Sequence, residues 1–184
     1  MPMIYKAADN EDELSQILAL QQENMRLSKS PEVEQEQGFV TLQHDMDLLK
    51  EMNSYASHII AKDGEKVAGY ALAMTKDFKE LIPGLIPMFN LMDSITVDGQ
   101  LMSKFEYLVM GQVCVDIDYR GTGVFKGMYE YYFDYHKTKY EYVITDIAAR
   151  NVRSIKAHFN VGFKEIHRFV EEGFEEWVVV AVAI

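Results

Sequence analysis

The pattern of apolar and polar positions in the first half of the chain predicts a strand, two helices and a hairpin. Apolar residues recur at helical spacing over residues 11–26, and Asn10 stands three residues before Glu13 as a helix-start signal. A second helix is expected to begin at Asp45, and Asp63-Gly64 predicts a tight turn. The expected strands are residues 3–7, 57–62 and 66–74.

Two segments of the first half are less regular. Residues 28–38 are polar, contain a proline and predict a mobile loop. Residues 81–95 are rich in Leu, Ile, Met and Phe but are broken by Pro83, Gly84 and Pro87. This stretch is either a binding lid or acceptor-pocket wall, or a short helix packed on the core.

In the second half, strands alternate with helices and the chain closes on a hairpin, which predicts a mixed α/β sheet. The turn Arg120-Gly121-Thr122-Gly123-Val124 joins a strand to a helix of about 16 residues. Asn151 is a suitable N-cap for a second helix, which Gly162 ends. The expected strands are residues 107–116, 142–148, 163–169 and 177–184.

Composition narrows the class of protein. The chain has 184 residues, a formal charge of −11 and a single cysteine, Cys114. We expect one domain over residues 1–184, no disulfide framework and a reducing, cytoplasmic location. The acidity argues against binding nucleic acid or an anionic membrane surface, and no apolar run reaches the length of a membrane span. The five histidines lack metal-ligand spacing, so no metal is expected.

The glycine turn presents successive backbone N–H groups at a helix N-terminus, where the helix dipole adds positive charge. Gly121 and Gly123 allow close approach of an anion, and Lys126 stands in the first helical turn. A diphosphate suits this arrangement, and a tight turn without a ligand is the alternative. The turn matches neither a P-loop nor the dinucleotide fingerprint.

The last predicted helix carries a second pattern. Asn151, Ser154 and His158 share one face, and that face lacks the usual mixture of lysine and glutamate. We expect the opposite stripe to pack on the sheet; its members are Val152, Ile155 and Phe159.

Together the two segments resemble a known family. VDIDYRGTGVFKGMYEYY is similar to the acyl-CoA signature Arg/Gln-x-x-Gly-x-Gly/Ala of the GNAT (GCN5-related) N-acetyltransferases, and NVRSIKAHFNVGF to their second signature, Asn-x-x-Ala-x-x-Leu-Tyr-x-x-x-Gly-Phe. The resemblance implies a mostly antiparallel sheet with helices on both faces and acetyl-CoA as acyl donor. It also implies a cofactor site, composed of Val113, Cys114, Val115, Arg120, Gly121, Thr122, Gly123, Val124, Phe125, Lys126, Asn151 and Ser154.

Two residues depart from the signatures. Phe125 stands where the first motif has Gly or Ala, and we expect its ring to point away from the diphosphate toward Tyr129 and Tyr132. His158 stands where many members have the tyrosine that protonates the departing thiolate. It is a catalytic candidate, and a structural histidine is the alternative.

The resemblance implies transfer of an acetyl group from acetyl-CoA to a primary amine by direct attack in a ternary complex. Asp146 is the candidate base, directly or through a water molecule that Gln112 orients, and a backbone N–H near residues 113–115 could stabilise the oxyanion. The alternative function is a non-catalytic acyl-CoA-binding module. The acceptor class stays open, and the apolar end VVVAVAI suggests a homodimer.

Overall fold

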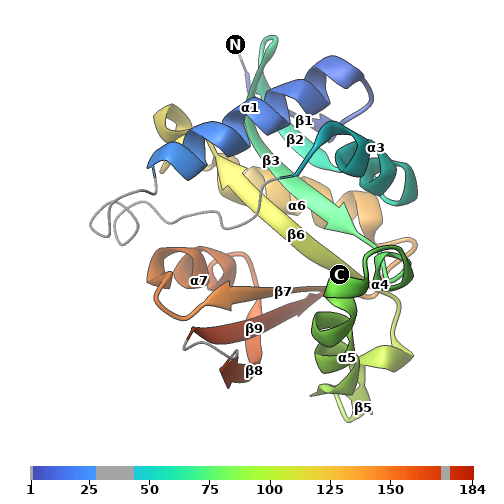
Figure 1. The fold of residues 1–184 in the computed structure, drawn as a ribbon. Helices are drawn as coiled ribbons and strands as arrows, with labels where there is room; N and C mark the ends of the chain where they lie inside the picture. The colour runs from blue at the N-terminus through green and yellow to red at the C-terminus, as the bar shows by residue number, and fades with distance from the viewer. Residues whose placement is uncertain (1, 28–43, 171–174) are drawn as a thin grey trace.

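The computed structural model describes residues 2–27, 44–170 and 175–184, and the predicted loop 28–38 and the turn at 172–173 lie outside them. Seven strands form a mixed sheet of order β1-β2-β3-β6-β7-β9-β8, in which every neighbouring pair is antiparallel except β6 and β7 (Figure 1). The strands are β1 (Ile4–Ala7), β2 (Ile59–Asp63), β3 (Lys66–Met74), β6 (Tyr107–Val115), β7 (Tyr142–Ala148), β8 (Lys164–Val170) and β9 (Glu176–Ala183). The predicted mixed α/β, mostly antiparallel architecture is confirmed.

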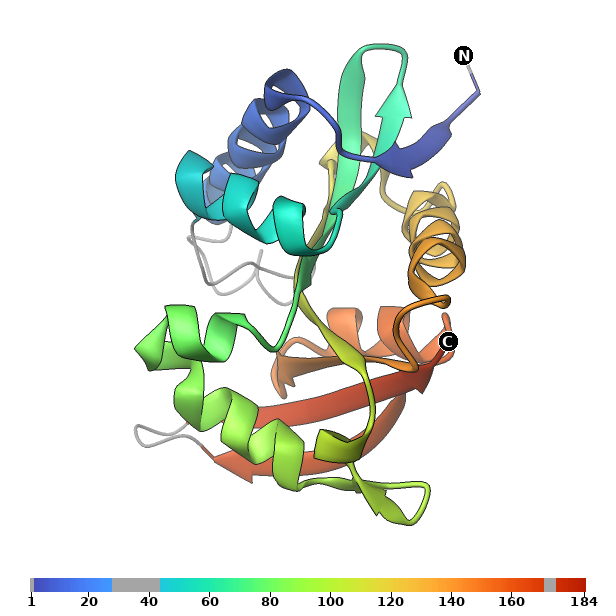
Figure 2. The same ribbon diagram turned by 90° about the vertical axis from the view of Figure 1, so that its right-hand side faces the viewer.

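Helices cover both faces of this sheet. On one face lie α1 (Glu11–Leu27), α3 (Met46–Tyr55), α4 (Phe78–Leu81) and α5 (Ile86–Ser94), and on the other lie α6 (Val124–His136) and α7 (Val152–Phe159) (Figures 1 and 2). Each face has its own apolar core, with Ile17, Leu49 and Phe89 on the first and Met128 and Tyr132 on the second. No helix in the described ranges has the length and apolar character needed to cross a bilayer.

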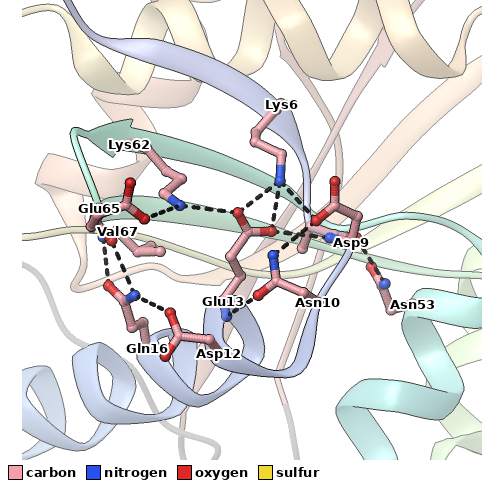
Figure 3. Close-up of polar contacts among 11 residues, drawn as sticks. Lys6, Asp9, Asn10, Asp12, Glu13, Gln16, Asn53, Lys62, Glu65 and Val67 are labelled. Carbon is pink, nitrogen blue, oxygen red and sulfur yellow. Dashed lines mark hydrogen bonds and ion pairs between the residues drawn. The ribbon is translucent and has the colours of Figure 1, made fainter.

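The N-terminal part of the fold follows its local sequence signals. Asn10 Oδ1 accepts the amide of Glu13 at 2.9 Å and Asp45 caps α3 by accepting the amide of Leu48 at 2.8 Å. Figure 3 shows that Lys6 and Lys62 both reach the carboxylate of Glu13, at 2.7 and 3.2 Å. The Glu13 side chain is only 2% exposed, so this ion pair fixes the start of α1 against β1 and β2.

Residues 75–106 connect two neighbouring strands, β3 and β6, by a long path. They form α4, α5, a short hairpin of β4 (Thr96–Val97) and β5 (Gln100–Leu101), and three-residue 3₁₀ turns. Phe78, Phe89 and Met92 are buried against the first core. Of the two expectations for this stretch, the structure therefore shows short helices packed on the core.

The C-terminal strand has neighbours on both sides. β9 pairs with β7 from Tyr142↔Ala183 to Ala148↔Trp177 and with β8 along its other edge. The expectation that VVVAVAI is bare and available to a second chain is therefore wrong, because its backbone groups already bond within the sheet.

Candidate functional site

Strands β6 and β7 diverge after a short parallel ladder. The ladder joins Tyr107–Val109 to Tyr142–Ile144, and β6 then continues to Val115 beside β3 alone. Opposite β3, the register passes from Met110 to Gln112, which leaves Gly111 as a bulge that bends β6. The Thr145 hydroxyl donates to the Met110 carbonyl at 2.9 Å where the strands separate. The free edge of Val113–Val115 therefore faces open space between the two strands.

A cleft of about 340 Å³ occupies this opening. It is lined by Asn24, Val113, Cys114, Val115, Tyr119, Arg120, Gly121, Gly123, Phe125, Lys126, Asn151, Arg153, Ser154, Ala157, Asn160 and Val161. The structure thus brings together every residue predicted for the cofactor site except Thr122 and Val124. The Thr122 hydroxyl instead donates to the Tyr119 carbonyl, and the Val124 side chain is buried in the second core.

The glycine turn forms one end of the cleft. Gly121 and Gly123 have φ angles of 78° and 93°, a region that favours glycine, and a Cβ built on either meets no atom within 4 Å. Both backbones are therefore open to close approach by a ligand. Gly123 is also the N-cap of α6, so the unpaired amides of the first helical turn and the helix dipole lie at this end.

The cleft has a charge opposite to that of the whole protein. Among the described residues that line it, Arg120, Lys126 and Arg153 are cationic and none is an aspartate or glutamate. The chain as a whole carries −11. A local cationic lining in an acidic protein favours an anionic ligand at this place.

Arg120 connects the turn to two other elements. Its Nε donates to the Val115 carbonyl at 3.0 Å, and its Nη2 donates to Asn24 Oδ1 at 2.5 Å. Asn24 belongs to α1 on the opposite face of the sheet, so the cleft reaches both sides of the strand divergence.

Helix α7 is oriented differently from the prediction. Val152 and Phe159 are 51% and 43% exposed, whereas Asn151 and His158 are buried. The expectation that the apolar stripe packs on the sheet is therefore wrong for these two residues, although Ile155 contacts the second core. The polar stripe turns inward because it has partners there: Asn151 caps the helix by accepting the Ser154 amide at 3.2 Å, and His158 bonds to Tyr129.

Phe125 contacts one of the two tyrosines expected for it. Its ring packs against Tyr129 at 4.9 Å and against His158 at 5.4 Å, and it also forms part of the cleft wall. The phenyl ring thus lies between α6 and α7.

His158 is enclosed and is not part of the cleft lining. It is 2% exposed, its Nδ1 lies 2.8 Å from the Ser154 carbonyl, and its Nε2 lies 2.8 Å from the Tyr129 hydroxyl. Burial lowers its pKa to about 4, so the imidazole is neutral at pH 7. These contacts favour the structural alternative for His158.

Asp146 lies on β7, two residues beyond the last pair with β6. Val143 and Ile147 of the same strand face the second core and Ile144 faces the first, so Asp146 faces the side of α1. It is half-buried. Asp146 and the cofactor turn therefore border the divergence from different elements.

A hydrogen-bonded group of side chains connects α1 to β6 on the same face. Gln112 Oε1 accepts from Gln21 Nε2 and from the Tyr70 hydroxyl, each at 2.5 Å, and Gln21 Nε2 also lies 2.9 Å from His44 Nδ1. Cys114 is 6% exposed, and burial raises its pKa to about 12, so the thiol stays protonated near neutrality.

Sequence reasoning missed part of the lining. Ala157 and Val161 follow Ser154 at helical spacing, so periodicity could have indicated them. Asn24 is 96 positions from Arg120, and no local signal links the two.

Comparisons with known proteins agree with this geometry. The model of the acetyltransferase (GNAT) family matches residues 17–163. A search of curated protein sequences finds no significant relative. Among solved structures, the ribosomal-protein-S18-alanine N-acetyltransferase from Escherichia coli is similar at 13% identity and a TM-score of 0.65, over 100% of this chain and 94% of its own.

Two further structures have the same fold. The yncA protein from Salmonella typhimurium, solved with its cofactor acetyl-CoA, is 14% identical with a TM-score of 0.63, over 98% of this chain and 93% of its own. NAA60 from Arabidopsis thaliana, solved with a bisubstrate analogue, is 12% identical with a TM-score of 0.66, over 100% of this chain and 98% of its own. The signature turn, the divergent strands and the family match lead to one conclusion: this chain belongs to the GNAT family of acetyltransferases.

Proposed function

We propose that the protein transfers an acetyl group from acetyl-CoA to a primary amine by direct attack within a ternary complex. The observation that carries the proposal is the cationic, glycine-bordered cleft between the diverging strands. Its residues match the chemistry of coenzyme A, which has a diphosphate at one end and a flexible amide-containing arm at the other.

The residues present fit this donor. Gly121 and Gly123 offer backbone amides without a Cβ in the way, and Arg120 and Lys126 supply positive charge beside them. The free edge of Val113–Val115 has backbone groups without a β7 partner, which can pair with the amides of the arm. The structure of yncA with acetyl-CoA supports this assignment through the shared fold.

The acceptor would approach from the face of α1. The cleft reaches Asn24 on that face, and Asp146 faces the same side. Asp146 would accept the proton of the attacking amine, directly or through a water molecule, and a backbone N–H of residues 113–115 would donate to the tetrahedral oxyanion. The Arabidopsis neighbour with its bisubstrate analogue supports simultaneous occupancy of donor and acceptor sites.

A covalent acyl-enzyme is the less favourable route. A thiol with a pKa of about 12 holds its proton, and the thiolate is the nucleophilic form. Direct attack needs no ionised Cys114.

Donor binding is tested with a matched pair of glycine variants. Gly123→Ala places a methyl group in the cradle and should weaken acetyl-CoA binding at least tenfold in calorimetry. Gly99→Ala, in the β4–β5 turn, has a similar positive φ of 81° and equally open space, but lies outside the cleft lining. Equal affinity for the two variants, or no binding by the parent protein, would refute the proposed donor site.

Catalysis is tested by measuring coenzyme A release across a panel of amines. Asp146→Asn should lower kcat about 100-fold, in the range of general-base catalysis, with little change in the affinity for acetyl-CoA. Unchanged turnover removes Asp146 from the mechanism. Binding of acetyl-CoA without release of coenzyme A for any amine would favour the non-catalytic binding module.

A further inference from the structure

The hydroxyl of Ser154 occupies an unusual position in the cleft wall. Ser154 lies in the first turn of α7 and lines the cleft. Its carbonyl oxygen lies 2.8 Å from His158 Nδ1, and its Oγ lies 3.4 Å from the same nitrogen. Ser154 and His158 therefore form a closed unit within one helical turn.

The position of each proton in this unit follows from what the atoms can do. A carbonyl oxygen only accepts, so His158 Nδ1 carries the proton. Because the buried ring is neutral, Nε2 has none, and it accepts the Tyr129 hydroxyl at 2.8 Å. The Tyr129 hydroxyl thus fixes the tautomer of His158.

The direction of the serine hydroxyl follows from this tautomer. The Nδ1–H group also points toward Ser154 Oγ, which must accept, so one lone pair of the oxygen is used. Among the residues that the structure describes, no group accepts the hydroxyl proton of Ser154. Because Ser154 borders the cleft, that proton is available to a bound ligand.

Aromatic packing keeps the unit rigid. The rings of Phe125, Tyr129 and Phe163 lie 5.4, 5.4 and 5.1 Å from the imidazole, nearly perpendicular to it. The phenyl ring at position 125 also lies in the cleft wall, so His158 itself does not line the cleft. A group that packs this tightly orients another residue and does not move to meet a substrate.

We propose that the Ser154 hydroxyl donates a hydrogen bond to the sulfur of coenzyme A as the thioester breaks, and that His158 and Tyr129 are positioning residues that hold this hydroxyl. The inference rests on the proposed function. The sulfur is the donor atom that gains negative charge during the reaction, and a hydrogen-bond donor in an apolar wall is strongest toward such an atom.

The step balances without a change in Ser154. The amine nitrogen forms a bond to the carbonyl carbon, the carbon–sulfur bond breaks, and its electron pair remains on sulfur. The amine proton passes to Asp146 or to water, and Ser154 keeps its own proton. Coenzyme A leaves as a hydrogen-bonded thiolate.

The test measures the thiol pKa of bound coenzyme A and needs no acceptor. Coenzyme A labelled with carbon-13 next to the sulfur is titrated on the enzyme by NMR. The bound thiol should titrate about one pH unit higher in Ser154→Ala than in the parent, a tenfold difference typical of one hydrogen bond to a charged atom. Ser54→Ala, an exposed serine on α3, is the matched control and should titrate like the parent.

The positioning role has its own variants. His158→Phe removes the N–H group behind Ser154 and should raise the thiol pKa as Ser154→Ala does, because the serine can then turn back onto its helix. His158→Asn restores an N–H donor and should recover the parent value. Nitrogen NMR of the parent should show the proton of His158 on Nδ1.

The outcomes separate the inference from the function beneath it. If coenzyme A binds but its thiol titrates identically in the parent and Ser154→Ala, the hydrogen bond to sulfur is refuted while the proposed function stands. A proton on Nε2, or equal values for His158→Phe and the parent, refutes the positioning role. If coenzyme A does not bind at all, the proposed function itself fails.

Discussion

Mild acid should destabilise this protein because three of its histidines are buried in the neutral form. Burial lowers the pKa of His58 to about 3, of His136 to about 4 and of His158 to about 4. His58 cannot gain a proton without losing a bond: its Nδ1 accepts the Ala73 amide at 3.1 Å, and its Nε2 lies 3.2 Å from the Leu49 carbonyl.

The size of the effect follows from the difference between folded and unfolded states. The unfolded chain binds protons below pH 6.5 and the folded chain does not until about pH 4, so the unfolded state holds more protons in this window. Stability therefore falls as the pH decreases from 6.5. At pH 5.5 each histidine costs about 1.4 kcal/mol relative to neutral pH, and the three together cost about 4 kcal/mol. A loss of this size lowers the Tm of a 150–250-residue protein by about 8–16 °C.

Urea unfolding followed by Trp177 fluorescence at pH 7.5 and pH 5.5 measures this loss. Both conditions lie above the ordinary pKa of glutamate, so carboxylate protonation contributes little. His158→Gln removes one of the three rings and should reduce the difference between the two pH values by about a third. Equal urea midpoints at the two pH values would show that the rings are not buried neutral, and would refute the reasoning.

Two further predictions concern the N-terminal strand and helix. Glu13→Gln should lower the unfolding free energy by about 2 kcal/mol, less than a fully buried pair, because Lys6 and Lys62 can turn partly to water; calorimetry with no change in Tm would contradict this. Gly127→Ala should destabilise by about 1 kcal/mol, since the added Cβ would lie 2.3 Å from the Tyr5 hydroxyl. In a Tyr5→Ala background the same change should instead stabilise by about 1 kcal/mol, as expected for alanine in a helix interior, and a double-mutant cycle without that reversal would show that Tyr5 is not the obstacle.

Elements with strong local signals were predictable. Asn10, Asp45 and Asn151 cap helices as expected, because a side chain that bonds an amide three residues away needs no tertiary context. The turn at Gly64, with a φ of 58°, follows equally from the Asp-Gly pair. The ordered pair of signatures also placed most of the cofactor cleft.

Predictions that depended on which face of an element is buried were less reliable. The spacing of Val152 and Phe159 indicated a helix correctly but could not say which stripe meets the protein, because the inward partners, Tyr129 and the cleft, come from other elements. In the same way, the apolar sequence of β9 suggested a free edge, and only the sheet order shows that it lies between β7 and β8.

The sequence by itself determined the local conformations and the glycine turn, since these depend on residues a few positions apart. The tertiary structure alone decided how the cleft is closed and charged. Arg120 meets Asn24 across 96 positions, and the bulge at Gly111 separates β6 from β7. It also decided that His158 lies behind Ser154, because the Tyr129 hydroxyl that holds the ring belongs to another helix. Contacts between distant segments set these features, and the one-dimensional pattern does not record them.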